Sequence, residues 1–363
     1  MSISPTVAHA LLGAGFAAYL AALFAAPAIG RRAVWTGIVV LVAGFALVPP
    51  LLSHDIYSYV DYARLGALHG IDPYVRGPAA APADPAFAQV TWPHTPSAYG
   101  ALFTLATYPL AWLPVSAAVW VLKIVAGASV LGLAAICARL APQRGVDPLR
   151  AAVFVALNPL VLVQVVGGGH NDALAMLLAM LGVAGVLGAT EASAGAALVV
   201  AVAIKASTAF LAPFALLGAG RRGRLMLGAA LALSAALAIS YLAFGWHWLQ
   251  AIGLAGENQS KTSHLSIPST AARLTGLGKE PVRAAALTLY AALFAYLLAW
   301  TWRGGDWLRA AAWASFGLLL ATSWLLPWYL IWTLPLAALS RDRRLQFLVL
   351  ALTAFQLGAR LPS

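Results

Sequence analysis

A group of polar residues follows the second long apolar run of the sequence. Asp55 stands beside His54 just after this run ends, and Tyr57 and Tyr59 come next. If the run crosses a membrane, a carboxylate at its edge is costly and is usually kept for a function. In a partly dry pocket the pKa of Asp55 would be raised, so that it could accept a hydroxyl proton near neutral pH. Asp55 is therefore our candidate general base; the alternative is that it begins a solvated loop or caps a helix.

The same stretch contains a second carboxylate, Asp61. If residues 56–69 are helical, Asp61 and Arg64 are three positions apart on one face, which predicts that they pair with each other. Asp55 has no such partner in the sequence, and this makes it the better candidate for proton transfer.

A second polar cluster lies between two apolar runs. Three glycines at 167–169 precede His170, Asn171 and Asp172. Asn171 or Asp172 could cap the following helix, and the cluster could also contact a substrate; we expect both in part. Because no Lys-Ser or Lys-Thr pair follows the glycines, the cluster is not a P-loop.

Two lysines interrupt apolar stretches. Lys205 is followed by Ser207 and Thr208, and it could either snorkel to an interface or face a cavity and bind an anion. We favour the cavity for Lys205. Lys123 is similar to Lys205 but the weaker candidate for a cavity, and for it we predict snorkelling.

The most polar stretch of the chain, residues 257–269, mixes hydroxyl groups with cations. Such a mixture suits phosphate oxygens, although a solvated loop would have a similar composition. The candidate phosphate ligands in or after this stretch are Lys261, His264 and Arg273. Near the C-terminus, Trp328 and Tyr329 could belong to an aromatic belt at a membrane interface or form a wall for a lipid or sugar.

The elements that must position these residues are predicted to be membrane helices. The chain has 363 residues, of which 62% are hydrophobic and 9% are charged, whereas a soluble domain has about 25% charged residues. The composition predicts an all-α polytopic membrane protein with one domain over residues 1–363. The apolar runs are 8–29, 33–52, 116–138, 151–166, 171–189, 193–204, 206–219, 225–244, 282–302, 309–323, 328–340 and 344–360.

Charge sets the predicted orientation. Placing Arg31, Arg32 and most other arginines of the short connections inside satisfies the positive-inside rule, provided that residues 100–113 lie at the interface and do not cross. Two long connections, 53–99 and 245–281, then lie outside and are expected to form the roof of an active site. The net charge of +11 is attributed to orientation and not to nucleic-acid binding. The single cysteine, Cys137, excludes an internal disulfide.

Several motifs together resemble a known family. They are residues 54–59, 69–74, 95–100 and 168–172, and Trp328-Tyr329 with Trp332. The sequence resembles GT-C-fold glycosyltransferases that use polyprenyl-phosphate sugars, above all the actinobacterial α-1,6-mannopyranosyltransferases and glycosyltransferase family 87. Ala98 and Ala101 stand where that family often has proline.

The resemblance implies an inverting transfer of mannose from a polyprenyl-phosphate donor to a hydroxyl of a glycan or glycolipid. The reaction would take place at the outer face of a bacterial plasma membrane, with Asp55 as the base. Lys205, Lys261, His264 and Arg273 would bind the donor phosphate. The residues expected to contact sugar or acceptor are His54, Tyr57, Tyr59, His170, Asn171, Asp172, Trp328 and Tyr329.

Neither a cofactor nor a metal is expected. The less favoured alternative is a divalent ion shared by Asp55 and Asp172. We expect a monomer surrounded by membrane lipids. The competing hypothesis is a secondary transporter, or a flippase for lipid-linked sugars, because such proteins also contain broken helices and intramembrane charges.

Overall fold

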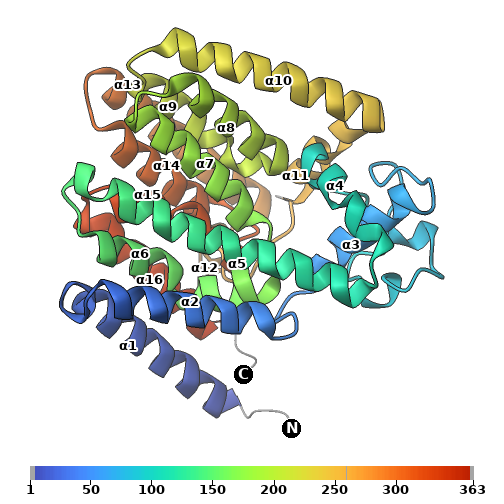
Figure 1. Cartoon of the computed structure of the whole chain (residues 1–363), viewed down its shortest axis with the longest axis horizontal. Coiled ribbons are helices and arrows are strands. Elements are labelled where there is room, and N and C mark those ends of the chain that lie inside the picture. The colour runs from blue at the N-terminus through green and yellow to red at the C-terminus, as the bar shows by residue number, and fades with distance from the viewer. Residues whose placement is uncertain (1–4, 259, 360–363) are drawn as a thin grey trace.

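The computed structural model describes residues 5–258 and 260–359, which form helices and connecting loops (Figure 1). The helices are α1 (Pro5–Ile29), α2 (Arg31–Leu47), α3 (Asp55–Ala67), α4 (Ala101–Thr107), α5 (Val115–Leu140), α6 (Pro148–Ala156), α7 (Asp172–Leu187), α8 (Glu191–Ile204), α9 (Leu211–Gly218), α10 (Arg222–Phe244), α11 (Gln250–Asn258), α12 (Ile267–Thr275), α13 (Lys279–Trp302), α14 (Trp307–Ala321), α15 (Leu334–Leu339) and α16 (Arg343–Ala359). Shorter turns of 3-10 or π type include η3 (Tyr108–Trp112), η5 (Val161–Val166), η6 (Ala206–Phe210) and η8 (Pro327–Trp332).

Within this described part, four helices are long and apolar enough to cross a membrane. They are the segment Ala10–Ile29 of α1, and α5, α10 and α13. Each of the twelve apolar runs coincides with helical segments, which confirms the prediction of an all-helical fold for the described residues. The four candidate spans are consistent with a membrane protein, and the number of crossings stays a prediction. Ala101–Trp112 is a shorter apolar helix, and at about 1.5 Å per residue it is too short to cross a bilayer unaided.

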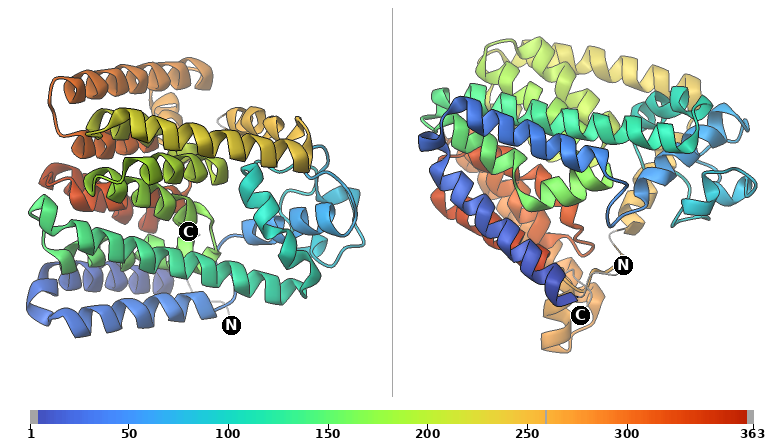
Figure 2. Two further views of the ribbon diagram at one scale, coloured as in Figure 1. Left: turned by 45° about the horizontal axis from the view of Figure 1, so that its top comes forward. Right: turned by 60° about the horizontal axis from the view of Figure 1, so that its bottom comes forward.

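The long helices lie side by side, and the loop-rich segments gather at one end of them. Figure 2 shows α3, α4 and α11 together at that end, away from the turns that join α1 to α2 and α5 to α6. The helix α8 packs against both α7 and α10. The largest core cluster spans both halves of the chain, from Tyr19 to Leu357.

Two apolar runs are broken where polar side chains are needed. The first run ends as α6 at Ala156, and the chain turns at Asn158-Pro159 before η5, because proline cannot continue the hydrogen-bond ladder. The second break is at Lys205, whose extended backbone (φ −150°, ψ 112°) separates α8 from η6. Both breaks lie inside the protein, where irregular backbone at membrane depth is tolerated.

The prediction that Lys123 snorkels to a membrane interface is wrong. Its side chain is fully buried, and its ammonium donates a hydrogen bond of 2.5 Å to the carbonyl oxygen of Gly167. This carbonyl lies in the segment between η5 and α7, and it also accepts a hydrogen bond of 3.0 Å from the backbone N–H of Leu51. Lys123 therefore stabilises an irregular turn and does not reach toward a membrane interface.

Close backbone contact fixes α8 against α10. A Cβ atom added to Gly195 would lie 2.0 Å from the carbonyl oxygen of Leu225, and one added to Gly228 would lie 1.9 Å from that of Ala192. Small residues let two helix backbones approach in this way. The position of α10 therefore depends on these two glycines.

The variant Gly228→Ala should destabilise the protein because the added methyl group must separate α8 from α10. Overpacking of this kind costs about 1–3 kcal/mol, and thermal unfolding in detergent measures the loss. Gly223→Ala in the same helix is the matched control, since nothing lies within 4 Å of an added Cβ there. Equal unfolding temperatures for the two variants would contradict the tight contact.

Candidate functional site

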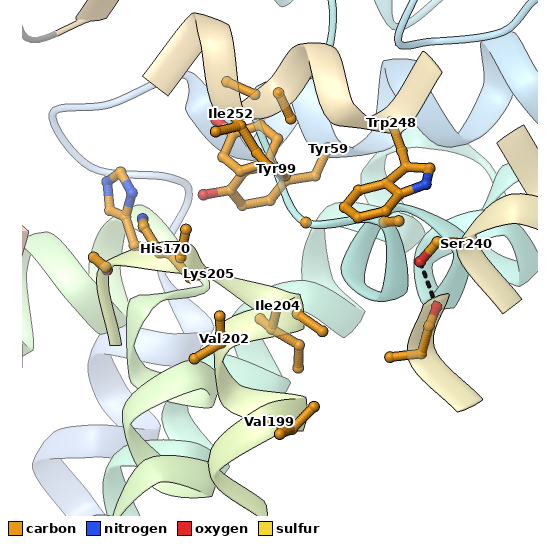
Figure 3. Close-up of a pocket in the computed structure, with 18 of the residues that line it drawn as sticks. Tyr59, Tyr99, His170, Val199, Val202, Ile204, Lys205, Ser240, Trp248 and Ile252 are labelled. Atoms are coloured by element: carbon orange, nitrogen blue, oxygen red, sulfur yellow. Dashed lines mark hydrogen bonds between the residues drawn. The ribbon is translucent and has the colours of Figure 1, made fainter. Parts of the chain in front are cut away.

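A cavity of about 550 Å³ lies where the loop-rich end of the molecule meets α8 and α10. Figure 3 shows Tyr59, Tyr99, His170 and Lys205 gathered on one side of it, with Val199 and Val202 further along α8. The cavity therefore joins a polar region to an apolar groove. The groove is lined by side chains from α8 and α10: Leu198, Val199, Val202, Leu233, Ala236 and Leu237.

Asp55 lines the polar region and is the first residue of α3. Its backbone N–H donates to the hydroxyl of Ser53 over 3.2 Å, which holds the start of the helix. Burial raises the pKa of the Asp55 carboxyl above its usual value, and nearby Asp172 raises it further; Lys205 and a hydrogen bond from Trp92 act in the opposite direction. A carboxyl group with a raised pKa inside a cavity has the properties of a general base.

Lys205 also lines the cavity, and its charge is paired within the protein. Its ammonium lies 2.6 Å from Oδ2 of Asp172 and 3.3 Å from Oδ1 of Asn171. Lys205 thus lies at a cavity, as we expected, and its binding of an anion stays a prediction. Because an ammonium has three donors, one remains after these two contacts.

Asp172 has no exposed surface and does not line the cavity. Its Oδ1 accepts a hydrogen bond of 2.7 Å from the indole N–H of Trp332 in η8, so both carboxylate oxygens have partners. Asn171 occupies the N-cap position of α7 but makes no capping hydrogen bond. Its side-chain oxygen instead accepts from Lys205 and, over 3.5 Å, from the hydroxyl of Tyr59.

His170 reaches the cavity because of the turn before it. Gly169 has a φ of +70°, and a Cβ there would lie 2.3 Å from Ile56, so only glycine fits. The imidazole of His170 stacks on Trp328, with ring centroids 3.7 Å apart. Burial lowers the pKa of His170, and the charge of Lys205 lowers it further, so His170 is neutral near pH 7.

The other predicted site residues divide into two groups. Tyr59, Lys261, Trp328 and Tyr329 line the cavity. His54, Tyr57, His264 and Arg273 do not. His54 lies edge-on to Tyr57 with its Nδ1 atom 3.2 Å from the carbonyl oxygen of Gln89. Arg273 donates a hydrogen bond of 3.0 Å to the carbonyl oxygen of His264, and it thereby ties α12 to the preceding loop.

The expected pair of Asp61 with Arg64 is wrong. Arg64 instead contacts Asp84 over 2.8 Å, and His69 contacts the same carboxylate over 2.7 Å. Asp61 is buried, and no hydrogen-bond partner of its carboxylate oxygens is found among the described residues. Burial, with a contribution from Asp84, raises the pKa of Asp61 to about 7.

Sequence reasoning did not select several residues that line the cavity. Tyr99 packs edge-on against Tyr59 with centroids 4.7 Å apart, and Trp92 and Trp324 enclose the ammonium of Lys261 at 4.4 Å and 4.8 Å. Tyr99 lies in the motif 95–100 that carries the family resemblance, whereas Trp92 and Trp324 had no signal in the sequence beyond that of aromatic residues near an interface. Within residues 5–258 and 260–359, no three His, Cys, Asp or Glu side chains come together as a metal site.

The fold and the cavity define the class of protein: a helical membrane protein whose interior combines an acid, a lysine, an aromatic wall and an apolar groove. Residues 2–221 match the family model described as alpha-(1->6)-mannopyranosyltransferase, N-terminal domain. This match covers more than half of the chain, and the protein belongs to that family.

Two curated relatives carry the same description. The chain is 31% identical over 351 residues to alpha-(1->6)-mannopyranosyltransferase A of Mycobacterium tuberculosis, covering 84% of this chain and 65% of the relative. It is 30% identical over 173 residues to the enzyme of that name from Corynebacterium glutamicum, covering 46% of this chain and 34% of the relative. The chain thus spans less than two thirds of either relative. No solved structure shows significant similarity to it.

Replacing Lys205 by Met should destabilise the fold because it leaves the Asp172 carboxylate buried without its cation. Removing one partner of a buried ion pair costs about 3–5 kcal/mol. The loss should be near the low end, since 18% of the Lys205 side chain is exposed. Denaturant unfolding in detergent, followed by tryptophan fluorescence, measures it.

The matched control is the double variant Lys205→Met with Asp172→Asn, which removes both charges and keeps an acceptor for Trp332. It should be more stable than Lys205→Met alone. If the double variant is the less stable of the two, the charge pair is not what holds this region together.

Proposed function

We propose that the protein transfers mannose from a polyprenyl-phosphate donor to a hydroxyl group of a glycan or glycolipid. The transfer proceeds with inversion, and Asp55 is the general base. The observation that carries the proposal is that Asp55 and Lys205 line one cavity which continues into an apolar groove. The names of the relatives, alpha-(1->6)-mannopyranosyltransferase, support mannose as the sugar.

The groove supports a lipid-linked donor. Its walls are aliphatic and it runs along α8 and α10 away from the polar region. An isoprenoid chain gains about 0.8 kcal/mol for each CH₂ group removed from water, whereas a nucleotide would leave its polar groups without partners there. A donor held in this way has its phosphate beside Lys205 and its lipid chain in the groove that runs along the two helices.

The chemistry needs a base on one side of the anomeric carbon and a cation on the other. Asp55 takes the proton of the acceptor hydroxyl while the oxygen attacks the anomeric carbon. The bond from this carbon to the phosphate oxygen breaks, and polyprenyl phosphate leaves with the bonding electrons. The remaining donor of the Lys205 ammonium stabilises the charge that develops on the phosphate.

Neutral His170 suits a contact to sugar hydroxyls. Its Nε2 atom is buried, and no partner for it is found in the described part of the chain. A neutral imidazole can donate or accept a hydrogen bond at this atom. Trp328, against which His170 stacks, adds an aromatic face on which the sugar ring can lie.

The arrangement of arginines supports an active site on the outer side of the membrane. The turns that join α1 to α2, α5 to α6 and α13 to α14 lie at the end of the bundle opposite α3 and α4 (Figure 2). Ion pairs of Arg144 with Asp306 and of Arg309 with Asp342 connect such turns. Under the positive-inside rule this arginine-rich end faces the cytoplasm, and the cavity then opens on the other side.

The variant Asp55→Asn should abolish transfer because an amide cannot accept the hydroxyl proton. The assay uses purified protein in liposomes, radiolabelled polyprenyl-phosphate mannose and a mannoside acceptor. The kcat of Asp55→Asn should be at least about 100-fold below that of the wild type, which is the usual contribution of a general base. The wild type should not use a nucleotide sugar. Sugar movement across the bilayer without a new glycosidic bond would favour the transporter hypothesis.

Asp61→Asn is the matched control in the same helix. Asp61 lies outside the cavity lining, and with a pKa of about 7 it is already partly neutral in the folded protein. This variant should keep most of the activity. Equal losses in both variants would contradict a specific role of Asp55.

The pH dependence follows from the contacts of Asp55. The active form is the carboxylate, so the rate should fall as the pH decreases through the pKa of Asp55, which burial holds above its usual value. The variant Trp92→Phe removes a hydrogen bond that lowers this pKa and should shift the acidic limb to higher pH. Rate profiles of kcat at saturating substrates measure the shift; an unchanged or lower acidic limb would contradict it.

A further inference from the structure

Three side chains from separate segments meet at the cavity and form what we term the indole clamp: Trp92, Lys261 and Trp324. The Lys261 ammonium lies 4.4 Å from the ring centre of Trp92 and 4.8 Å from that of Trp324. The two indole rings are 6.3 Å apart and perpendicular. No carboxylate of the described residues lies within ion-pair distance of Lys261, so aromatic faces alone hold its charge.

The indole clamp lies next to the candidate base. All three of its residues line the same cavity as Asp55, and the Trp92 side chain is close enough to the Asp55 carboxyl to lower its pKa. A base must come within about 2.6–3.2 Å of the hydroxyl that it deprotonates. The acceptor sugar must therefore lie beside Asp55, where the clamp supplies indole surface.

The indole faces can bind either an ammonium or a sugar. A pyranose ring presents a face of C–H groups, which packs on an aromatic ring, and its hydroxyl groups point outward from that contact. A cation over an indole face is held only weakly when no carboxylate pairs with it. A sugar that contacts both rings can therefore displace Lys261.

The apolar groove and the indole clamp are formed by different parts of the chain. The groove is made by α8 and α10, whereas the clamp is made by the connections 53–99 and 245–281 and by the segment between α14 and η8. Donor and acceptor can thus reach the anomeric carbon from separate sides, which a displacement with inversion requires.

We propose that Trp92 and Trp324 form the acceptor-sugar subsite, and that Lys261 occupies this subsite until an acceptor sugar displaces it. The inference rests on the proposed transferase function. It assigns the two tryptophans to acceptor binding, and it makes Lys261 a competitor of the acceptor and not a ligand of the donor phosphate.

The test compares steady-state kinetics of variants in liposomes, with octyl α-1,6-mannobioside as acceptor and polyprenyl-phosphate mannose as donor. Trp324→Ala should raise the acceptor KM by about tenfold, the scale of one lost aromatic contact, and leave the donor KM unchanged. Trp92→Phe retains an aromatic face and should raise the acceptor KM less. Trp112→Ala is the control, since that side chain is 67% exposed and outside the cavity.

The variant Lys261→Met separates the two possible roles of Lys261 by the direction in which the acceptor KM or the donor KM changes. If Lys261 competes with the acceptor, its loss should lower the acceptor KM severalfold and leave the donor KM unchanged. If Lys261 binds the donor phosphate, its loss should raise the donor KM. The second result would overturn the proposal.

Binding without turnover separates this inference from the proposed function. Calorimetric titration of octyl α-1,6-mannobioside into protein without donor should show binding to the wild type, weaker binding to Trp324→Ala and tighter binding to Lys261→Met. This pattern would support the subsite even if no transfer were detected. Transfer by the wild type with equal mannoside binding by all three proteins would overturn the subsite and leave the transferase function standing.

Discussion

The buried pair of Asp172 with Lys205 is the interaction on which the site depends. A carboxylate without solvent exposure must be paired, because an isolated buried charge is prohibitively costly. Asp172 begins α7, Lys205 breaks the chain between α8 and η6, and Trp332 completes the contact from η8. The pair therefore joins three elements and holds one cation at the wall of the cavity.

This constraint bears on the role that we propose for Lys205, the binding of a donor phosphate at a membrane boundary. In the resting protein the charge of Lys205 is neutralised by Asp172, so this partly buried lysine is not left unpaired at the wall of the cavity. It still has a donor available, and the phosphate of a lipid-linked sugar brings its own charge. Asp55 faces the same space from α3, and burial keeps its pKa above the usual value. The acid, the cation and the groove each supply one requirement of transfer from a lipid phosphate.

Features of the fold and the site that depend on the local pattern of apolar and polar residues could be predicted from the sequence. Apolar runs located the helices, and Asp55 and Lys205 were selected because each interrupts or borders such a run. Contacts between distant segments could not be predicted. Arg64 pairs with Asp84, twenty positions away, and not with its helical neighbour. Lys123 is buried against the carbonyl of Gly167, and no periodicity reveals that carbonyl. Trp92 and Trp324 come together only in the folded chain.

The most direct test of the account is a structure with a non-hydrolysable donor, a polyprenyl phosphonate analogue of the mannosyl phosphate, determined by electron cryo-microscopy. A phosphonate oxygen should lie within about 3 Å of the Lys205 ammonium, the isoprenoid chain should lie in the groove along α8 and α10, and the anomeric carbon should face Asp55. A bound lipid elsewhere on the protein, or a sugar on the far side of Lys205 from Asp55, would contradict it.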